Sequence, residues 1–288
     1  MLRGIDHLVL CVNDLKKARS VYEALGFTMT PIAQHPFGTG NTLVQMDGCF
    51  LEVLAVTQPG DIPEADGAHF SFAAFNRDFL KSREGMSMLV LDSTDEVADR
   101  SEFLDKGLHV YAPFEFQRLA KQPDGSEHTV GFSLTFISDP SLADLGFFTC
   151  KQWRPDLFWK PDYQQHANGA LSIDEVFVIT PEPSQGAAFL AAFADGVVED
   201  SGTGVLKVKT ARGSLGLYTP HAFEARFPGA LPQAATTAPC FGGYSINVRD
   251  SKTVEELWPA AGLSVQNTAG VRWLHPDQGL GCVIAVKD

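Results

Sequence analysis

The stretch GIDHLVLCVNDLKKARSVYEALGF, residues 4–27, decides the predicted fold. Its first half, IDHLVLCV, has the length and apolar content of a buried strand. In NDLKKARSVYEALG, apolar residues recur at steps of three and four, which predicts an amphipathic helix with Asn13 or Asp14 as N-cap and Gly26 as its end. Three more strands are expected in FTMTPIAQ, NTLVQMDG and CFLEVLAV, because Gly, Pro and Asn separate them. The predicted order is βαβββ.

The same order of elements recurs along the chain. Further copies begin at GMSMLVLDSTDEVADRSEFLDKGL, LSIDEVFVITPEPSQGAAFLAAFADG and CFGGYSINVRDSKTVEELWPAAGL. Aligning their first strands puts Met88, Glu175, and Gly243 or Tyr244 at the position of His7. One unit cannot cover its own apolar face, whereas two units side by side can form an eight-stranded, incompletely closed barrel. We therefore predict two paired modules, residues 1–165 and residues 166–288.

Composition narrows the classes of partner. The 288 residues carry a formal net charge of −13, so neither nucleic acid nor an anionic membrane surface is an expected partner. No apolar run approaches the roughly 20 residues that span a bilayer, and the N-terminus does not read as a signal peptide, which favours the cytoplasm. The five cysteines are scattered and form no CxxC pair, so buried reduced thiols are expected. The expected partner is a small molecule, and a homodimer is left open.

The repeated βαβββ order resembles the vicinal oxygen chelate superfamily, which includes glyoxalases and extradiol dioxygenases. Residues 4–27, GTGNTLVQMDGCFLEVLAV and FWKPDYQQHANGA resemble its glyoxalase-like domain family. This likeness covers residues 1 to about 170, and the remainder matches in pattern and topology. The resemblance implies an α+β fold of the glyoxalase/bleomycin resistance/dihydroxybiphenyl dioxygenase type, with four βαβββ units forming two paired incomplete barrels. The second pair is expected to be degenerate.

The resemblance also implies a site. In the superfamily, side chains on the first and fourth strands of two facing units hold a divalent ion, and His7 and Glu52 stand at these positions of the first unit. Imidazole and carboxylate suit Zn, Ni, Mn, Co or Fe. Independently, a glutamate within the apolar run FLEVLAV needs a partner or a metal if it is buried. The second unit offers only Met88 and Phe148, so Gln152 is the nearest further metal ligand in sequence; His128 and His166 are other candidates.

Further residues are candidates for the wall of the cleft. His35 and Asn41, in HPFGTGNT, could line its mouth, and Phe148, Trp159 and His166 could contact the substrate. The phenylalanine-rich segment at residues 70–79 is expected to pack on the sheet or to cover an apolar pocket. Arg118 is expected to be a solvated strand residue.

Three functions remain open at this stage. The favoured hypothesis is a metal-dependent lyase or isomerase acting on a small oxygenated substrate, with His7 and Glu52 as metal ligands and catalytic residues, and with the ion stabilising an enolate. The alternative is a small-molecule-binding protein of the bleomycin-resistance type that catalyses nothing. A third is an enzyme without metal, in which His7 and Glu52 act as acid and base. An extradiol dioxygenase is disfavoured, because the third and fourth units offer no set of two histidines and one glutamate.

Overall fold

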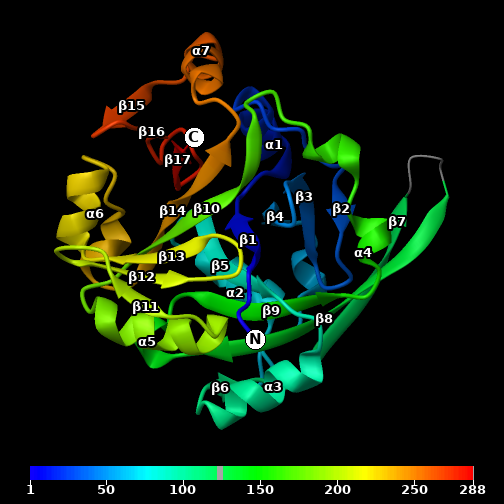
Figure 1. The fold of residues 1–288 in the computed structure, drawn as a ribbon. Coiled ribbons are helices and arrows are strands. Elements are labelled where there is room, and N and C mark those ends of the chain that lie inside the picture. The colour runs from blue at the N-terminus through cyan, green and yellow to red at the C-terminus, as the bar shows by residue number, and fades with distance from the viewer. Residues whose placement is uncertain (122–125, 288) are drawn as a thin grey trace.

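The computed structural model describes residues 1–121 and 126–287, and its strands form two mixed sheets (Figure 1). The first sheet has the order β2-β3-β4-β1-β5-β9-β8-β6, and β7 pairs with β8 beside β6. Its strands are β1 Ile5–Cys11, β2 Ala33–Gln34, β3 Thr39–Gln45, β4 Phe50–Val56, β5 Gly85–Asp92, β6 His109–Val110, β7 Phe114–Lys121, β8 Glu127–Ser138 and β9 Gly146–Gln152.

The second sheet has the order β11-β12-β13-β10-β14-β17-β16-β15. Its strands are β10 Ala170–Ile179, β11 Val198–Asp200, β12 Val205–Lys209, β13 Ser214–Tyr218, β14 Cys240–Val248, β15 Val265–Thr268, β16 Val271–Leu274 and β17 Val283–Lys287. Each sheet therefore contains two of the predicted units, and the predicted α+β fold is confirmed, with one mixed sheet for each pair of units.

The helices follow the repeat. One helix comes after the first strand of each unit: α1 Leu15–Ala24, α3 Glu96–Asp105, α5 Pro183–Ala194 and α7 Lys252–Ala260. Asp14, one of the two predicted caps, accepts hydrogen bonds from the backbone N–H groups of Lys16 and Lys17. Two helices lie between the units of a pair, α2 Phe72–Phe79 and α6 Pro220–Arg226, and the short α4 Pro155–Phe158 lies between the pairs. Single 3₁₀ turns complete the chain: η1 Pro59–Asp61, η2 Pro140–Leu142, η3 Pro161–Gln164 and η4 Gln233–Thr236.

The strand register relates the units of each pair by an approximate two-fold axis. In the first sheet His7 pairs with Val90 and Val9 with Met88, so Met88 corresponds to His7. Because β4 and β9 run parallel to β1 and β5, Phe148 then corresponds to Glu52. These correspondences agree with the sequence alignment.

In the second sheet Glu175 pairs with Ser245 and Phe177 with Gly243, so Gly243 corresponds to Glu175. The pairing of Glu175 with Ser214 then makes Gly216 the counterpart of Glu52. The register thus selects Gly243 from the two residues that the sequence had left open.

The two sheets share one apolar core. Alternation along β1 sends Leu8 and Leu10 to this core, which also contains Val176 and Val178 of β10. Hydrogen bonds also cross it: among them, the hydroxyl groups of Tyr22 and Tyr244 lie 3.0 Å apart, and Trp258 Nε1 donates to the Leu25 carbonyl at 3.0 Å. The opposite faces of the two sheets carry separate clusters, one in each module. Each sheet therefore has its own concave face, directed away from the shared core.

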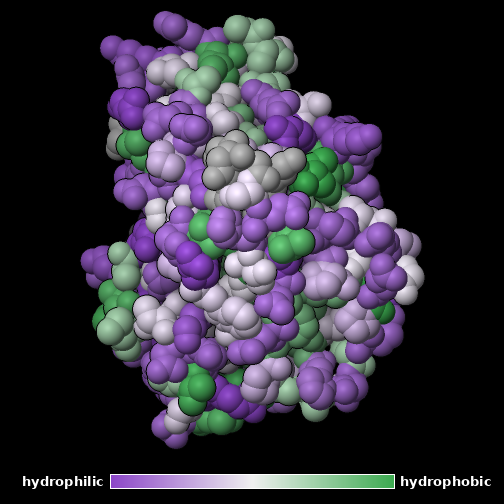
Figure 2. Space-filling view, turned by 90° about the vertical axis from the view of Figure 1, so that its right-hand side faces the viewer, coloured by the Kyte–Doolittle hydropathy of each residue, from purple (hydrophilic) through white to green (hydrophobic). Residues whose placement is uncertain are grey.

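The face shown in Figure 2 is mostly hydrophilic outside the grey atoms, with hydrophobic residues scattered among the others. Within residues 1–121 and 126–287, no helix is long and apolar enough to cross a bilayer. All five cysteines are buried and carry free thiols, as predicted.

Candidate functional site

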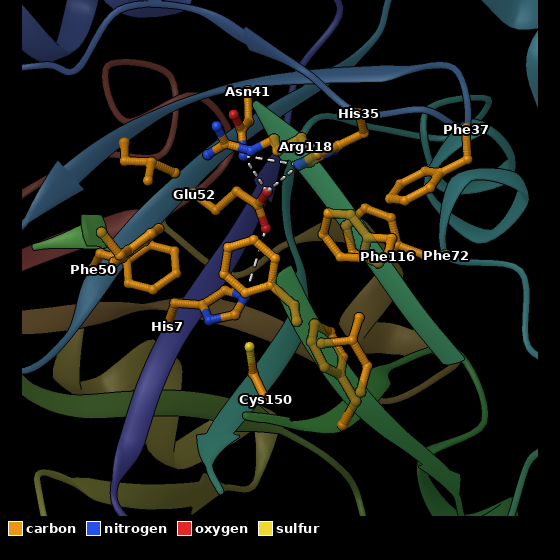
Figure 3. A pocket seen from close by; sticks show the side chains of 15 residues that line it. His7, His35, Phe37, Asn41, Phe50, Glu52, Phe72, Phe116, Arg118 and Cys150 are labelled. Carbon is orange, nitrogen blue, oxygen red and sulfur yellow. Dashed lines mark hydrogen bonds and ion pairs between the residues drawn. The ribbon is translucent and has the colours of Figure 1, made fainter. Parts of the chain in front are cut away.

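His7 and Glu52 meet on the concave face of the first sheet. They lie on the parallel neighbours β1 and β4, and both are buried in the interior. His7 Nε2 is 3.6 Å from Glu52 Oε2. The imidazole is stacked on Phe50, with ring centroids 4.3 Å apart, which fixes the plane of the ring. The two polar residues that interrupt apolar strands are thus brought together (Figure 3).

A third polar residue, Asp6, holds His7 from the other side. The register of β1 against β5 shifts between Ile5 and His7, so Asp6 is the extra residue of a bulge, a feature that re-aims side chains. Its Oδ1 is 2.6 Å from His7 Nδ1. Strict strand alternation would put neighbouring residues on opposite faces, and for that reason the sequence analysis missed Asp6.

The geometry of Asp6 and His7 indicates which imidazole nitrogen carries the proton. A carboxylate at 2.6 Å from Nδ1 favours the proton on that nitrogen, which turns Nε2 toward Glu52. Nε2 then either carries a second proton or faces the Glu52 carboxyl group as an acceptor. Asp6, His7 and Glu52 therefore form a line along which a proton can be held.

Asn41 and His35 contact the second oxygen of Glu52. Asn41 Nδ2 donates to Glu52 Oε1 at 2.6 Å and lies 3.1 Å from His35 Nε2. His35 Nδ1 is 2.9 Å from the Thr39 hydroxyl group. Since Nε2 accepts from the amide, Nδ1 carries the proton of His35. His35 thus orients Asn41, and Asn41 orients Glu52.

Burial sets the charge states of these groups. It raises the pKa of Glu52, and this effect is opposed by the charge of His7 and the hydrogen bond from Asn41. Burial also lowers the pKa of His35 to about 3, so this imidazole is neutral at pH 7. His35 Nε2 lies 3.7 Å from Glu52 Oε1, and this contact joins a neutral ring to a carboxyl group rather than two ions. Cys150 also lines the site, but burial raises the pKa of its thiol, which disfavours a nucleophilic thiolate.

His7, His35, Asn41, Glu52 and Cys150 border an apolar cavity of about 40 Å³. One water molecule needs roughly 10–15 Å³ of cavity volume, so the cavity has room for about three. Seven phenylalanines line it: Phe37, Phe50, Phe72, Phe116, Phe132, Phe148 and Phe158. A larger ligand needs displacement of some of these side chains. The low polarity of the walls is the cause of the raised pKa of Glu52.

The prediction made for Arg118 from the sequence was wrong. It was expected in solvent, but it lines the cavity from β7, and Figure 3 shows it beside Asn41 and Glu52. Arg118 and Phe116 are two residues apart, so strand alternation puts both on the face that meets the cavity. The prediction failed because a charged strand residue is normally solvated, although the alternation in FEFQRLA places Arg118 on the same strand face as Phe114 and Phe116.

The other predicted site residues lie partly inside and partly outside the cavity. His35, Asn41 and Phe148 line the cavity with His7 and Glu52. Gln152 lies behind His7, where its Nε2 donates to Asp6 Oδ2 at 3.3 Å. The cavity-lining residues do not include Trp159, His166 or His128.

Local contacts account for those three side chains. Trp159 packs on Phe50 and Phe158 outside the cavity. Both ring nitrogens of His166 bond to the backbone, Nδ1 to the Thr28 amide and Nε2 to the Gln45 carbonyl. His128 lies on the exposed first part of β8.

A divalent metal ion, which the superfamily implies, fits these donors poorly. His7 and His35 approach different oxygens of Glu52, and the Asn41 amide group uses the acceptors of both His35 and Glu52. Two of the four superfamily positions are Met88 and Phe148. In the described part of the chain, no three His, Cys, Asp or Glu side chains are grouped to hold a metal. His7 and Glu52 alone give fewer ligands than the three that a catalytic zinc site keeps.

The chain was then compared with known proteins. The sequence profile of the glyoxalase-like domain matches residues 5–193, more than half of the chain. The chain belongs to the glyoxalase-like domain family. No curated protein matches it. This family assignment confirms the resemblance seen in the sequence, and the structural neighbours lie in the same superfamily.

Solved structures share the fold at low sequence identity. A hypothetical protein from Staphylococcus aureus is 13% identical, with a TM-score of 0.71 and 99% of each chain covered. A mutant of 4-hydroxymandelate synthase from Streptomyces coelicolor is 12% identical, with a TM-score of 0.64, covering 99% of this chain and 92% of that one. The Mn(II)-bound glyoxalase from Novosphingobium aromaticivorans is 12% identical, with a TM-score of 0.57, covering 99% and 81%. At these identities the likeness concerns the fold alone.

Proposed function

We propose that this glyoxalase-like protein is a lyase or isomerase that moves a proton at a carbon next to a carbonyl group of a small substrate, with Glu52 as the base. One observation carries the proposal. The Glu52 carboxyl group lies in an apolar cavity between an imidazole and an amide, and burial raises its pKa. A base works best when its pKa is close to the working pH, and such a shift moves a glutamate in that direction.

Each neighbour has a role in this proposal. Asn41 holds Oε1, so Oε2 faces His7 and the cavity. His7 exchanges the proton with Glu52 and returns it to the substrate at the end of the reaction. Asp6 is a positioning residue, because it fixes the tautomer of His7 from outside the cavity. The proton leaves the substrate carbon for Glu52, and the electron pair moves to the carbonyl oxygen to give an enolate.

The proposal assigns this chemistry to the protein side chains and not to a metal. Divalent metals are bound by distant members of the superfamily, such as the manganese-bound glyoxalase. Here His7 and Glu52 are the only two of the four superfamily positions with suitable donors. The earlier hypothesis of a metal-dependent enzyme is therefore replaced by the acid–base alternative, and metal content is part of the test.

The experiment measures deuterium exchange. The full chain is incubated in D₂O with small carbonyl compounds, namely 3-methyl-2-oxobutanoate, phenylpyruvate, isobutyraldehyde and acetophenone derivatives with an α-hydrogen, and loss of the α-proton signal is followed by NMR. We expect exchange above the uncatalysed rate with at least one compound, unchanged by chelators. Glu52→Gln should reduce it about 10²–10⁴-fold, the usual contribution of a general base. The rate should rise as the pH increases through the raised pKa of Glu52, because the base must be ionised.

Three results would contradict the proposal. Stoichiometric metal in protein purified without chelators, together with activity lost on chelation, would restore the metalloenzyme hypothesis. Tight binding of these compounds without any exchange would favour the non-catalytic binding protein, which the phenylalanine-lined cavity also suits. Glu52→Gln with unchanged exchange would assign the base to another residue.

A further inference from the structure

We infer that Arg118 binds an anionic group of the ligand, so that the cavity takes small organic acids, a carboxylate attached to an apolar body. This ligand class would be the substrate class of the proposed proton-transfer enzyme. The reaction rests on the proposed function, whereas binding of the acid does not depend on it. Arg118 lies on β7 opposite Val130 of β8, and its side chain enters the cavity near Glu52.

Two other arginines with buried or partly buried side chains show that such a guanidinium group normally contacts carboxylates. Arg3 contacts Asp99 at 2.8 Å and Glu102 at 2.6 Å. Arg226 contacts Glu175 at 3.1 Å. Both guanidinium groups therefore have carboxylates in direct contact, as a charge taken out of water requires.

Arg118 lacks this compensation in the described part of the chain. Its Nε is buried and has no hydrogen-bond partner. Burial lowers the pKa of its guanidinium group, and only the charge of Glu52 acts in the opposite direction. A buried N–H without an acceptor costs about 1–3 kcal/mol, so a ligand oxygen at this atom would be stabilising. A carboxylate is the natural partner, because its two oxygens match the guanidinium fork.

The lining of the cavity supplies the rest of the ligand description. Apart from Arg118, Glu52, Asn41 and the two histidines, its walls are hydrophobic side chains and the Cys150 thiol. Asn41 Oδ1 is a second buried polar atom without a partner, and it can accept from a hydroxyl group on the ligand or from water. A small acid with a branched or aromatic body would place its charge at Arg118 and its apolar part among the phenylalanines.

Arg118 could instead serve only as a distant counter-charge for Glu52. In that case Arg118 would have no negative charge to compensate in Glu52→Gln, and binding of an acid would not depend on Arg118. If Arg118 receives a carboxylate, removing the negative charge of Glu52 should strengthen the binding of an acid, because a repulsion disappears. The two roles therefore predict different results for Glu52→Gln: no preference for the acid if Arg118 is only a counter-charge, and stronger binding of the acid if Arg118 receives the carboxylate.

The experiment is isothermal titration of the full chain at pH 7 with matched pairs: isobutyrate against isobutyramide, and benzoate against benzamide. Each pair has nearly the same shape and differs in charge. We expect the acid to bind at least 10-fold more tightly than its amide. Arg118→Gln should abolish the difference, and Arg118→Lys should keep part of it. Arg154→Gln is the control, since Arg154 is exposed and pairs with Asp156 on the surface.

The outcomes separate this inference from the proposed function. Acid preference that is retained or increased in Glu52→Gln supports the inference even if no deuterium exchange is found. Equal binding of acid and amide, or no binding of either, would overturn it. Preference retained in a natively folded Arg118→Gln variant, with folding checked by circular dichroism and by the Arg118→Lys variant, would also overturn it.

Discussion

The two concave faces of the molecule each contain one buried glutamate, and the two differ in their neighbours. Glu175 accepts from the Tyr218 hydroxyl group at 2.6 Å and contacts Lys207 and Arg226, each at 3.1 Å. Glu52 has an amide and two imidazoles instead. The same sheet architecture thus holds one carboxylate in contact with a lysine and an arginine, whereas no ion pair joins the other to a lysine or arginine of the described residues. We interpret the first as structural and the second as functional.

The segments between the units reinforce the difference. In the second module, Phe223 of α6 and Phe227 just after it pack against Phe177 on the concave face. In the first module, α2 contributes Phe72 to the wall of the cavity. The helices occupy equivalent places in the repeat, but one fills a concave face and the other borders a cavity. A cavity remains where the covering segment leaves room.

The largest effect is expected from breaking the Glu175 network. Arg226→Met should destabilise the protein by about 3 kcal/mol, because it takes the arginine from a buried ion pair and leaves Glu175 less compensated. Chemical denaturation measures the change, with Arg154→Met as the surface control. Exchange activity at the first site should persist in the folded protein. A loss of stability no greater than in the control would show that the network does not stabilise the second module.

A somewhat smaller loss is expected at Gly216, the counterpart of Glu52. A Cβ atom at this position would lie 2.2 Å from Glu175 Oε1, so Gly216→Ala must displace the carboxylate or the strand. Overpacking of this kind costs about 1–3 kcal/mol. Thermal unfolding of this variant and of Gly60→Ala gives the comparison, because a Cβ at Gly60 would meet nothing within 4 Å and neither glycine has a positive φ. Equal losses in the two variants would contradict the assigned crowding.

The smallest effect has the opposite sign. Because the folded pKa of Glu52 is raised, folding favours its protonated form, and stability from this group is lost as the pH rises through the folded pKa. Glu52→Gln should therefore be more stable than the wild type at pH 8, and the difference should shrink toward pH 4. Denaturation at several pH values measures it. A Glu52→Gln variant less stable than wild type at pH 8 would mean that the carboxylate is compensated, like Glu175.

The sequence could predict what periodicity and repetition encode. The strand–helix pattern of residues 4–27 recurs with the same spacing of elements, so the units and their correspondence, including Met88 and Phe148, followed without coordinates. His7 and Glu52 could be singled out because polar residues within apolar strands are costly unless they are paired. Asp6 was missed because its position depends on a bulge in β1. Arg118 was missed because a charged strand residue is usually solvated, although it shares a strand face with Phe114 and Phe116.

By itself, the amino-acid sequence determined the four βαβββ units, because hydrophobic alternation and helical periodicity are local properties of the chain. It also placed two polar side chains in the first and fourth predicted strands of the first unit, and the family resemblance implied that these strands bring them together. Tertiary structure alone decided that an arginine 66 positions after Glu52 lies beside it, that Asp6 orients His7, and that α6 fills the second concave face. Such contacts join segments far apart in sequence, and only the packing of the whole chain brings them within the short range at which charges and hydrogen bonds act.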